Sequence, residues 1–174
     1  QCHRGDIYDT RDHHFHKKAG EAGEPLRIDG KVVDVGTGAE CKNCHMPERV
    51  YMGIDFRADH SLRIPRPDLS MQIKTPNACT QCHTGRSDEW AAAAIEKWYG
   101  PDRASHYAEV LAPANSGDFS VALQLVEMVG DTGVGPVVRA TAVWLLSNAG
   151  GENSRSTITG ALKNPDPLIR YTAV

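Results

Sequence analysis

The sequence predicts a mainly α-helical protein in which an N-terminal domain with little regular secondary structure precedes α-helical solenoid repeats. Pro65, Pro67 and Pro76 exclude a long helix in their part of the N-terminal region. Residues 135–143 and 166–174 align with an offset of 31 residues and share Pro, Arg, Thr, Ala and Val. A period of this length is typical of solenoids built from paired helices.

Short local signals place the first regular elements. The run 31–35 lies between Asp29-Gly30 and a glycine-rich turn, which predicts a strand or hairpin arm. Ser87 is followed by two acidic residues, which predicts a capped helix over 88–99 that stops at Gly100.

Further helices are expected after Gly100. One is predicted over 102–111. The two repeats predict helix pairs at 119–129 with 136–148, and at 153–163 with 166 onward.

The composition describes an ordinary folded protein. The chain has 174 residues, a length that suits one large or two small domains. Its residues are 40% hydrophobic, and its net charge is −3. Acidic and basic side chains are mixed evenly, so no nucleic-acid surface is predicted. No run approaches the ~18 apolar residues of a membrane span.

Two pentapeptides, 41–45 and 79–83, have the pattern Cys-x-x-Cys-His. In this pattern two thiols bond covalently to haem c and the histidine binds its iron. Two intervening residues place the thiols about one helical turn apart, as the edge of one porphyrin requires. The predicted thioether residues are Cys41, Cys44, Cys79 and Cys82, and the predicted proximal ligands are His45 and His83.

The chain opens with Gln1-Cys2-His3, the back half of the same pentapeptide. We therefore expect a third haem site with Cys2 and His3, about three haems in all, and a chain that is a fragment of a longer protein. All five cysteines would then belong to haem sites, with none left for a disulfide.

An iron with two histidine ligands needs a second imidazole from elsewhere in the sequence. Five histidines remain for three distal positions: His13, His14, His16, His60 and His106. The cluster at 12–16 is the densest, and we expect at least one of its histidines to bind iron; solvated surface histidines are the alternative. His60 is a further candidate, and His106 is the candidate for the haem of His83, with an exposed helical histidine as the alternative.

Two arginines could contact the haem propionates. The planar guanidinium groups of Arg63 and Arg66 suit a carboxylate, although solvated surface arginines would look the same in the sequence. We expect residues 1–86 to form the haem-organised domain, 87–115 to complete it as a helical hairpin, and 116–174 to form HEAT-like helical repeats.

Residues 1–111 resemble a family of periplasmic multihaem cytochromes c in which a haem domain precedes HEAT or tetratricopeptide repeats. The motifs that carry the resemblance include residues 8–10, 13–17, 44–47, 51–52, 59–61, 64–70, 75–79 and 89–92. The tail resembles HEAT repeats, with Arg139 and Arg170 at the characteristic arginine position. The missing first cysteine before Cys2 departs from the family pattern.

The resemblance implies electron transfer in respiratory or environmental redox chemistry, with further haem sites upstream of Gln1. Redox partner proteins such as other cytochromes would be the partners, and a larger complex or filament is compatible with it. Covalent haem is normally attached outside the cytoplasm, so a periplasmic or extracellular location is expected.

The leading hypothesis is an electron carrier rather than an enzyme, because haems with two histidine ligands have no open iron position. The alternatives are an enzyme that reduces a small nitrogen or sulfur oxide at a five-coordinate haem, and a repeat-based binding module with a tethered haem domain. A four-cysteine zinc site is the chemical alternative, but the spacing between the two cysteine pairs is longer than usual.

Overall fold

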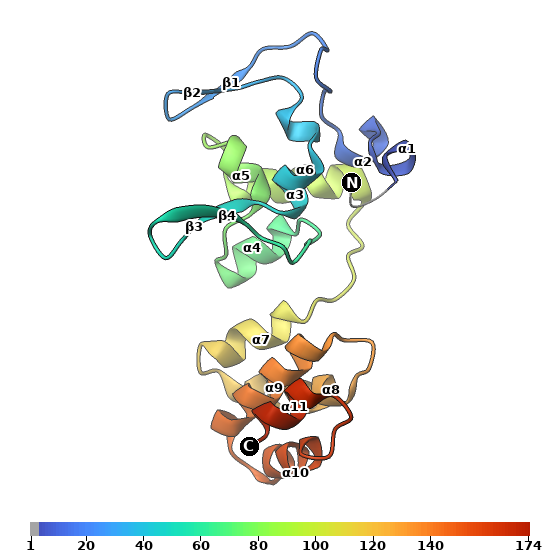
Figure 1. The fold of residues 1–174 in the computed structure, drawn as a ribbon, viewed down its shortest axis with the longest axis vertical. Helices are drawn as coiled ribbons and strands as arrows, with labels where there is room; N and C mark the ends of the chain where they lie inside the picture. The colour runs from blue at the N-terminus through green and yellow to red at the C-terminus, as the bar shows by residue number, and fades with distance from the viewer. Residues whose placement is uncertain (1–3) are drawn as a thin grey trace. The chain divides into compact units, whose positions relative to one another are not determined.

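The computed structural model describes residues 4–174 and is mainly helical, as predicted (Figure 1). The chain forms two compact units, residues 1–102 and Arg103–Val174.

The first unit begins with two helical turns and a hairpin. These elements are α1 (Gly5–Tyr8), α2 (Arg11–His14), β1 (Leu26–Ile28) and β2 (Lys31–Val33). The strands pair antiparallel around Asp29 and Gly30, which both have positive φ (47° and 80°). Asp-Gly favours this two-residue turn, and β2 confirms the predicted hairpin arm.

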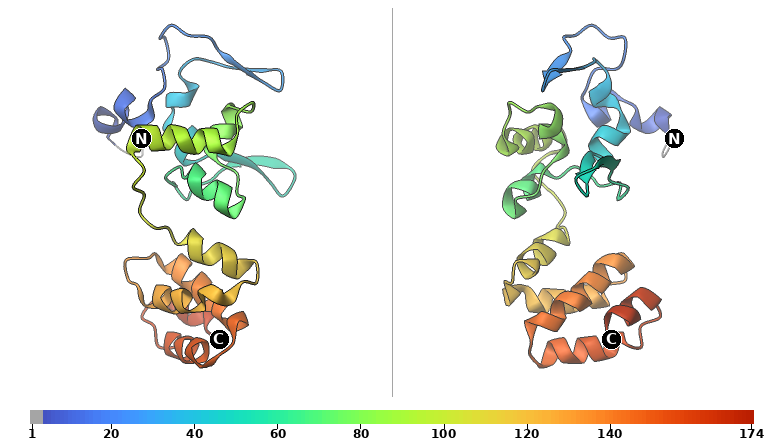
Figure 2. Two further views of the ribbon diagram at one scale, coloured as in Figure 1. Left: turned by 180° about the vertical axis from the view of Figure 1, so that it is seen from behind. Right: turned by 60° about the vertical axis from the view of Figure 1, so that its left-hand side comes forward.

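A second hairpin follows the first complete pentapeptide. The elements here are the 3₁₀ turn η1 (Thr37–Ala39), α3 (Cys41–His45), β3 (Glu48–Tyr51) and β4 (Asp55–Ala58). The hairpin pairs Val50 with Phe56 on one face, and both side chains are exposed. Figure 2 shows both hairpins from two further directions.

Three helices close the first unit: α4 (Pro67–Ile73), α5 (Ala78–Cys82) and α6 (Asp88–Tyr99). The sequence analysis did not predict α4, although Pro67 at its first position and an acidic first turn are helix-start signals. The hydroxyl of Ser87 accepts a hydrogen bond from the amide of Trp90 at 3.3 Å, which confirms the predicted cap of α6. Helix α4 packs against α6, where Leu69 and Ile95 are buried.

The second unit consists of successive packed helices. They are α7 (Ala108–Asn115), η2 (Phe119–Val121), α8 (Ala122–Gly130), α9 (Pro136–Ala149), α10 (Glu152–Ala161) and α11 (Pro167–Thr172). These bounds agree with the predicted pairs at 119–129 with 136–148 and at 153–163 with 166 onward. Leu125, Val143, Leu146 and Ile169 are fully buried at the centre of one apolar cluster.

The two repeat arginines occupy equivalent places. Arg139 in α9 donates from Nε to the carbonyl of Val129 at the end of α8 (2.9 Å). Arg170 in α11 donates to the carbonyls of Asn164 and Pro165, just beyond α10 (2.7 and 2.9 Å). Arg139 therefore satisfies a carbonyl in the last turn of α8, where a positive charge is favourable, and Arg170 satisfies two carbonyls of the turn between α10 and α11.

The structure divides the expected hairpin at 87–115 between the two units. Helix α6 belongs to the first unit, whereas α7 packs against η2, α8 and α9 of the second. Helix α7 begins at Ala108 rather than at 102, and Ala114 joins the apolar cluster of the repeats. Burial of this face explains why α7 belongs with the second unit.

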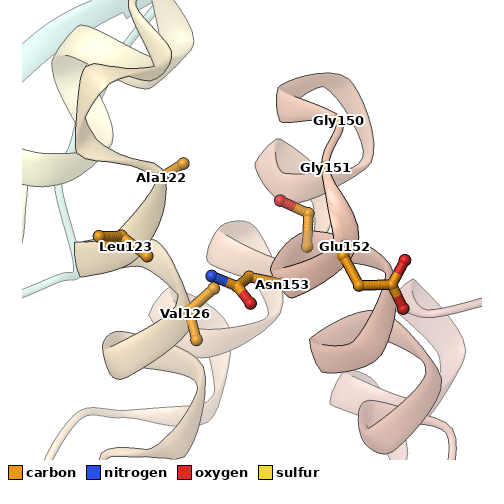
Figure 3. Close-up of a pocket in the computed structure, with 8 residues that line it drawn as sticks. Ala122, Leu123, Val126, Gly150, Gly151, Glu152 and Asn153 are labelled. Atoms are coloured by element: carbon orange, nitrogen blue, oxygen red, sulfur yellow. The ribbon is translucent and has the colours of Figure 1, made fainter.

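A shallow hollow of about 250 Å³ lies between α8 and the start of α10 (Figure 3). Its lining includes Ala122, Leu123 and Val126 on one side and the turn 150–154 on the other. None of the predicted site residues lies there. Within residues 4–174, no helix is long and apolar enough to cross a membrane.

Two leucines of α8 provide a matched test of the apolar cluster. Leu125 is 0% exposed and Leu123 is 61% exposed. We expect Leu125→Ala to lower the free energy of unfolding by about 2–5 kcal/mol, because it leaves a cavity, and Leu123→Ala to change it by less than about 0.5 kcal/mol. Urea unfolding followed by circular dichroism measures both, and equal effects would contradict this packing.

Candidate functional site

The first complete pentapeptide forms helix α3, anchored at two points. The side-chain nitrogen of Asn43 donates to the carbonyl of Thr37 in η1 (2.7 Å). The Nδ1 atom of His45 lies 2.8 Å from the carbonyl of Arg63 and can only donate to it. Metal-binding histidines commonly hold their second nitrogen in this way, which leaves Nε2 for the metal.

The second pentapeptide lies on α5, whose start is fixed by Asn77. The side-chain oxygen of Asn77 accepts from the amides of Cys79 and Thr80 (2.9 and 3.1 Å). Its side-chain nitrogen donates to Asp88 at the start of α6 (2.6 Å). Asn77 is buried, so this one side chain ties the pentapeptide helix to α6.

The ring of His13 faces the ring of His45. Their centres are 6.0 Å apart and their planes differ by only 12°. Burial lowers the pKa of His13, and the neighbouring charge of His45 lowers it further. Both effects favour the neutral imidazole, which is the form that binds a metal.

The ring of His16 lies at a similar distance from the ring of His83, but the two rings are tilted. The ring centres are 6.3 Å apart with an angle of 33° between the planes. Nδ1 of His16 lies 2.5 Å from the carbonyl of His14, so it donates there and Nε2 remains for a metal. Burial lowers the pKa of His83, and the charge of His16 adds to the shift.

The separation of the ring centres in the two imidazole pairs agrees with two histidine ligands of one metal ion. An imidazole nitrogen binds a metal at about 2 Å, and the ring centre lies about 1 Å further out, so the centres of two rings that share a metal lie up to about 6 Å apart. The pairs His13–His45 and His16–His83 both have this separation. Each pair joins a pentapeptide histidine to the histidine segment, residues 11–16, so the residues present fit haem c with two histidine ligands.

Aromatic residues at the end of α6 support the histidine segment. Phe15 stacks on Trp98 with ring centres 4.7 Å apart and planes within 2°. The edge of His16 meets Trp98 at 6.0 Å, and the hydroxyl of Tyr99 donates to the carbonyl of His13. No signal in the sequence pairs these aromatic rings with Phe15.

His14 and His106 have a different hydrogen-bonding pattern. Nδ1 of His14 accepts from the amide of His16, and Nδ1 of His106 accepts from the amide of Ala108, both at 3.1 Å. A neutral ring that accepts at Nδ1 carries its proton on Nε2. For His14 this nitrogen is buried 3.4 Å from a carboxylate oxygen of Asp9, an arrangement that favours a structural role over metal binding.

His60 lies just after β4 and is exposed. Its Nδ1 donates to the carbonyl of Ala58 (2.8 Å), the pattern also seen at His45 and His16. His60 therefore keeps the orientation of Nε2 that a metal ligand needs. Cys2 and His3, the residues of the third expected site, lie outside the described residues.

The two arginines predicted to contact propionates differ in their surroundings. Both nitrogens of the Arg66 fork contact the carboxylate of Asp68 at 2.7–3.0 Å, and the Arg66 side chain is mostly buried. Arg63 is exposed; its Nε donates to Ser61, and its carbonyl holds His45. Arg63 is thus the arginine adjacent to a pentapeptide histidine.

The thiols of the two pentapeptides lie near each other, because α3 contacts α5. Burial raises the pKa of Cys44 to about 11, with smaller contributions from Cys79, Cys82 and Cys41. Burial also raises the pKa of Cys79 and of Cys82. Within residues 4–174, no three His, Cys, Asp or Glu side chains are grouped as a ready-made metal site.

Comparisons with known protein families, with curated proteins and with solved structures find no match to this chain. The family resemblance drawn from the motifs therefore stays an expectation.

The two helix caps near His83 provide a test of the local structure. We expect Asn77→Ala to lower the free energy of unfolding by about 2 kcal/mol, since it removes a buried cap and its bond to Asp88. Ser87→Ala removes one exposed cap bond of α6 and should cost about 0.5–1 kcal/mol. Thermal unfolding of both variants checks this order, and a larger loss for Ser87→Ala would be inconsistent with it.

Proposed function

We propose that this chain is a multihaem c-type cytochrome that carries electrons along closely spaced haems, each with two histidine ligands. The observation that carries the proposal is the pair of facing imidazoles at 6.0 and 6.3 Å, one for each complete pentapeptide. Neither a surface histidine cluster nor a cysteine-only zinc site requires this pairing.

Each site would draw on its own pentapeptide and on the shared histidine segment. Cys41 and Cys44 would hold the first haem covalently, with His45 and His13 as its iron ligands. At the second site the corresponding residues are Cys79 and Cys82, with His83 and His16. Bound haem supplies a one-electron iron couple.

Ligation by two histidines favours electron transfer over catalysis. Two imidazoles bound to each iron would leave no position for a substrate, and the reduction potential would be lower than with a methionine ligand. The haem enzyme of the sequence analysis would need a five-coordinate iron. At both complete pentapeptides a second histidine faces the first, which supports the carrier instead.

The helical repeats would provide a surface for partner docking or assembly. The proposal includes redox proteins, such as other cytochromes, as the partners and an exported location, because haem c is attached outside the cytoplasm. Val137 and Leu168 occupy equivalent positions of the two repeats and are both exposed. Such repeated exposed positions are typical of solenoid binding surfaces.

Intact mass and a pyridine haemochrome spectrum test the cofactor. We expect at least two covalent haems per chain after maturation in an exporting host, with about three if Cys2 and His3 form a site, and low-spin bands throughout. Elemental analysis serves as the control for zinc. A matured chain with zinc and no covalent haem would exclude the proposal, and a high-spin band in the unsubstituted chain would favour the enzyme.

Single substitutions test the distal ligands. We expect His13→Ala and His16→Ala each to convert one haem per chain from low spin to high spin, because each removes one iron ligand, without changing the number of covalent haems. His106→Ala is the matched control and should leave the spectrum unchanged. Added imidazole should restore the low-spin bands of the first two variants.

The same series distinguishes the two candidates for the haem of His83. If His106→Ala produced the high-spin haem and His16→Ala did not, the assignment of His16 would be wrong. Resonance Raman spin-state markers and optical spectra, recorded on the purified oxidised proteins, provide the measurement.

A further inference from the structure

Gly38, in the turn before α3, lies directly against the ring of His16. A Cβ atom built at Gly38 would be 2.4 Å from Cδ2 of His16, 3.0 Å from Cγ and 3.2 Å from Nε2. The closest approach is therefore to the ring edge that carries Nε2. The backbone φ of Gly38 lies outside the left-handed range, so steric contact alone, and not conformation, requires glycine here.

His16 has little room to move away from an added methyl group. Its Nδ1 is bound to the carbonyl of His14, and its ring makes a T-shaped contact with the ring of Trp98. The preceding residue, Phe15, has a left-handed backbone (φ 55°) and is stacked on Trp98. A side chain at Gly38 would thus have to turn the imidazole or break one of these contacts.

The turn that contains Gly38, residues 36–38, also lies close to the chain just after the histidine segment. A Cβ at Gly36 would lie 2.4 Å from the backbone nitrogen of Ala19, and Gly36 has a φ of +106°. On its other side the turn is joined to α3 by the bond from Asn43 to the carbonyl of Thr37. The turn therefore contacts both the segment that carries His16 and the helix that carries His45.

We propose that Gly38 is a positioning residue for His16, which keeps the imidazole directed at His83, and that its turn thereby links the second site to the helix of the first. The inference rests on the proposed function, because it assumes that His16 and His83 share an iron. Gly38 is not itself an iron ligand in this proposal. It acts by leaving space for the ring of His16.

The test is Gly38→Ala in the full matured chain, with Gly135→Ala as the control. A Cβ at Gly135 meets no atom within 4 Å and needs no unusual φ. We expect Gly38→Ala to lose one low-spin haem per chain, to match His16→Ala in its optical and Raman spectra, and to keep its number of covalent haems. Added imidazole should restore the low-spin bands, and Gly135→Ala should resemble the unsubstituted chain.

The double variant His16→Ala/Gly38→Ala makes the result decisive. If the added methyl acts only through the ring of His16, the double variant will have the same spectrum and yield as His16→Ala alone, even where Gly38→Ala matures poorly. A normal low-spin spectrum in Gly38→Ala would overturn the inference, as would a double variant that matures worse than His16→Ala. Loss of all covalent haem from the unsubstituted chain would instead defeat the proposed function, so the two failures are distinguishable.

Discussion

The stacking of Phe15 on Trp98 is the contact on which the arrangement of the first unit depends. Phe15 has a left-handed backbone, which ends α2 and redirects the chain between His13 and His16. A left-handed conformation of a non-glycine residue costs about 1–2 kcal/mol of free energy. A pair of stacked aromatic rings stabilises the fold by about 0.5–1.5 kcal/mol beyond the contribution of the area it buries. The two are comparable, so the stacked rings hold a conformation that this segment would not adopt by itself.

The two units obtain their stability in different ways. The second unit buries a continuous cluster of apolar side chains from α7 to α11. Among the described residues of the first unit, the buried hydrophobic side chains are Leu69, Ala91 and Ile95, while the β3–β4 hairpin exposes Val50 and Phe56. A chain of this length needs more buried apolar area than that. Large flat apolar cofactors would supply the missing contact area, which agrees with the proposed haems.

Short sequence signals predicted the elements that depend on interactions between residues close together in the chain. The serine cap at Ser87, the Asp29-Gly30 turn and the repeat period each specify structure within a few residues, and the corresponding elements are present. The boundary between the units was not predictable in this way, since the sequence of α7 does not say which neighbour buries its face. Helix α4 was missed because the prolines around it were interpreted only as helix breakers.

At the candidate site, too, the sequence predicts residues but not the contacts between them. The spacing within the pentapeptides predicts Cys41 and His45 as haem-binding residues, but the partner of each histidine depends on contacts between residues far apart in the sequence. The sequence does not show in which directions the side chains of residues 13–16 point. The helical turn of α2 and the left-handed Phe15 determine these directions. The distinction between His14 and His16 then follows from hydrogen bonds that only the folded chain shows: Nδ1 accepts in one ring and donates in the other.

Placing both facing histidines on one short segment has a consequence for electron transfer. Because His13 and His16 are three residues apart and α3 contacts α5, the two proposed irons would be close neighbours. A rotation of the segment would then disturb the ligands of both sites at once, so rigidity of this segment matters more than rigidity elsewhere in the unit. The hydrogen bond from Tyr99, the ring of Trp98 and the close approach of Gly38 all restrain this segment. Restraint by α6 and by the turn at Gly38 would suit the proposed carrier, because iron ligands must keep their positions while the charge on the iron changes.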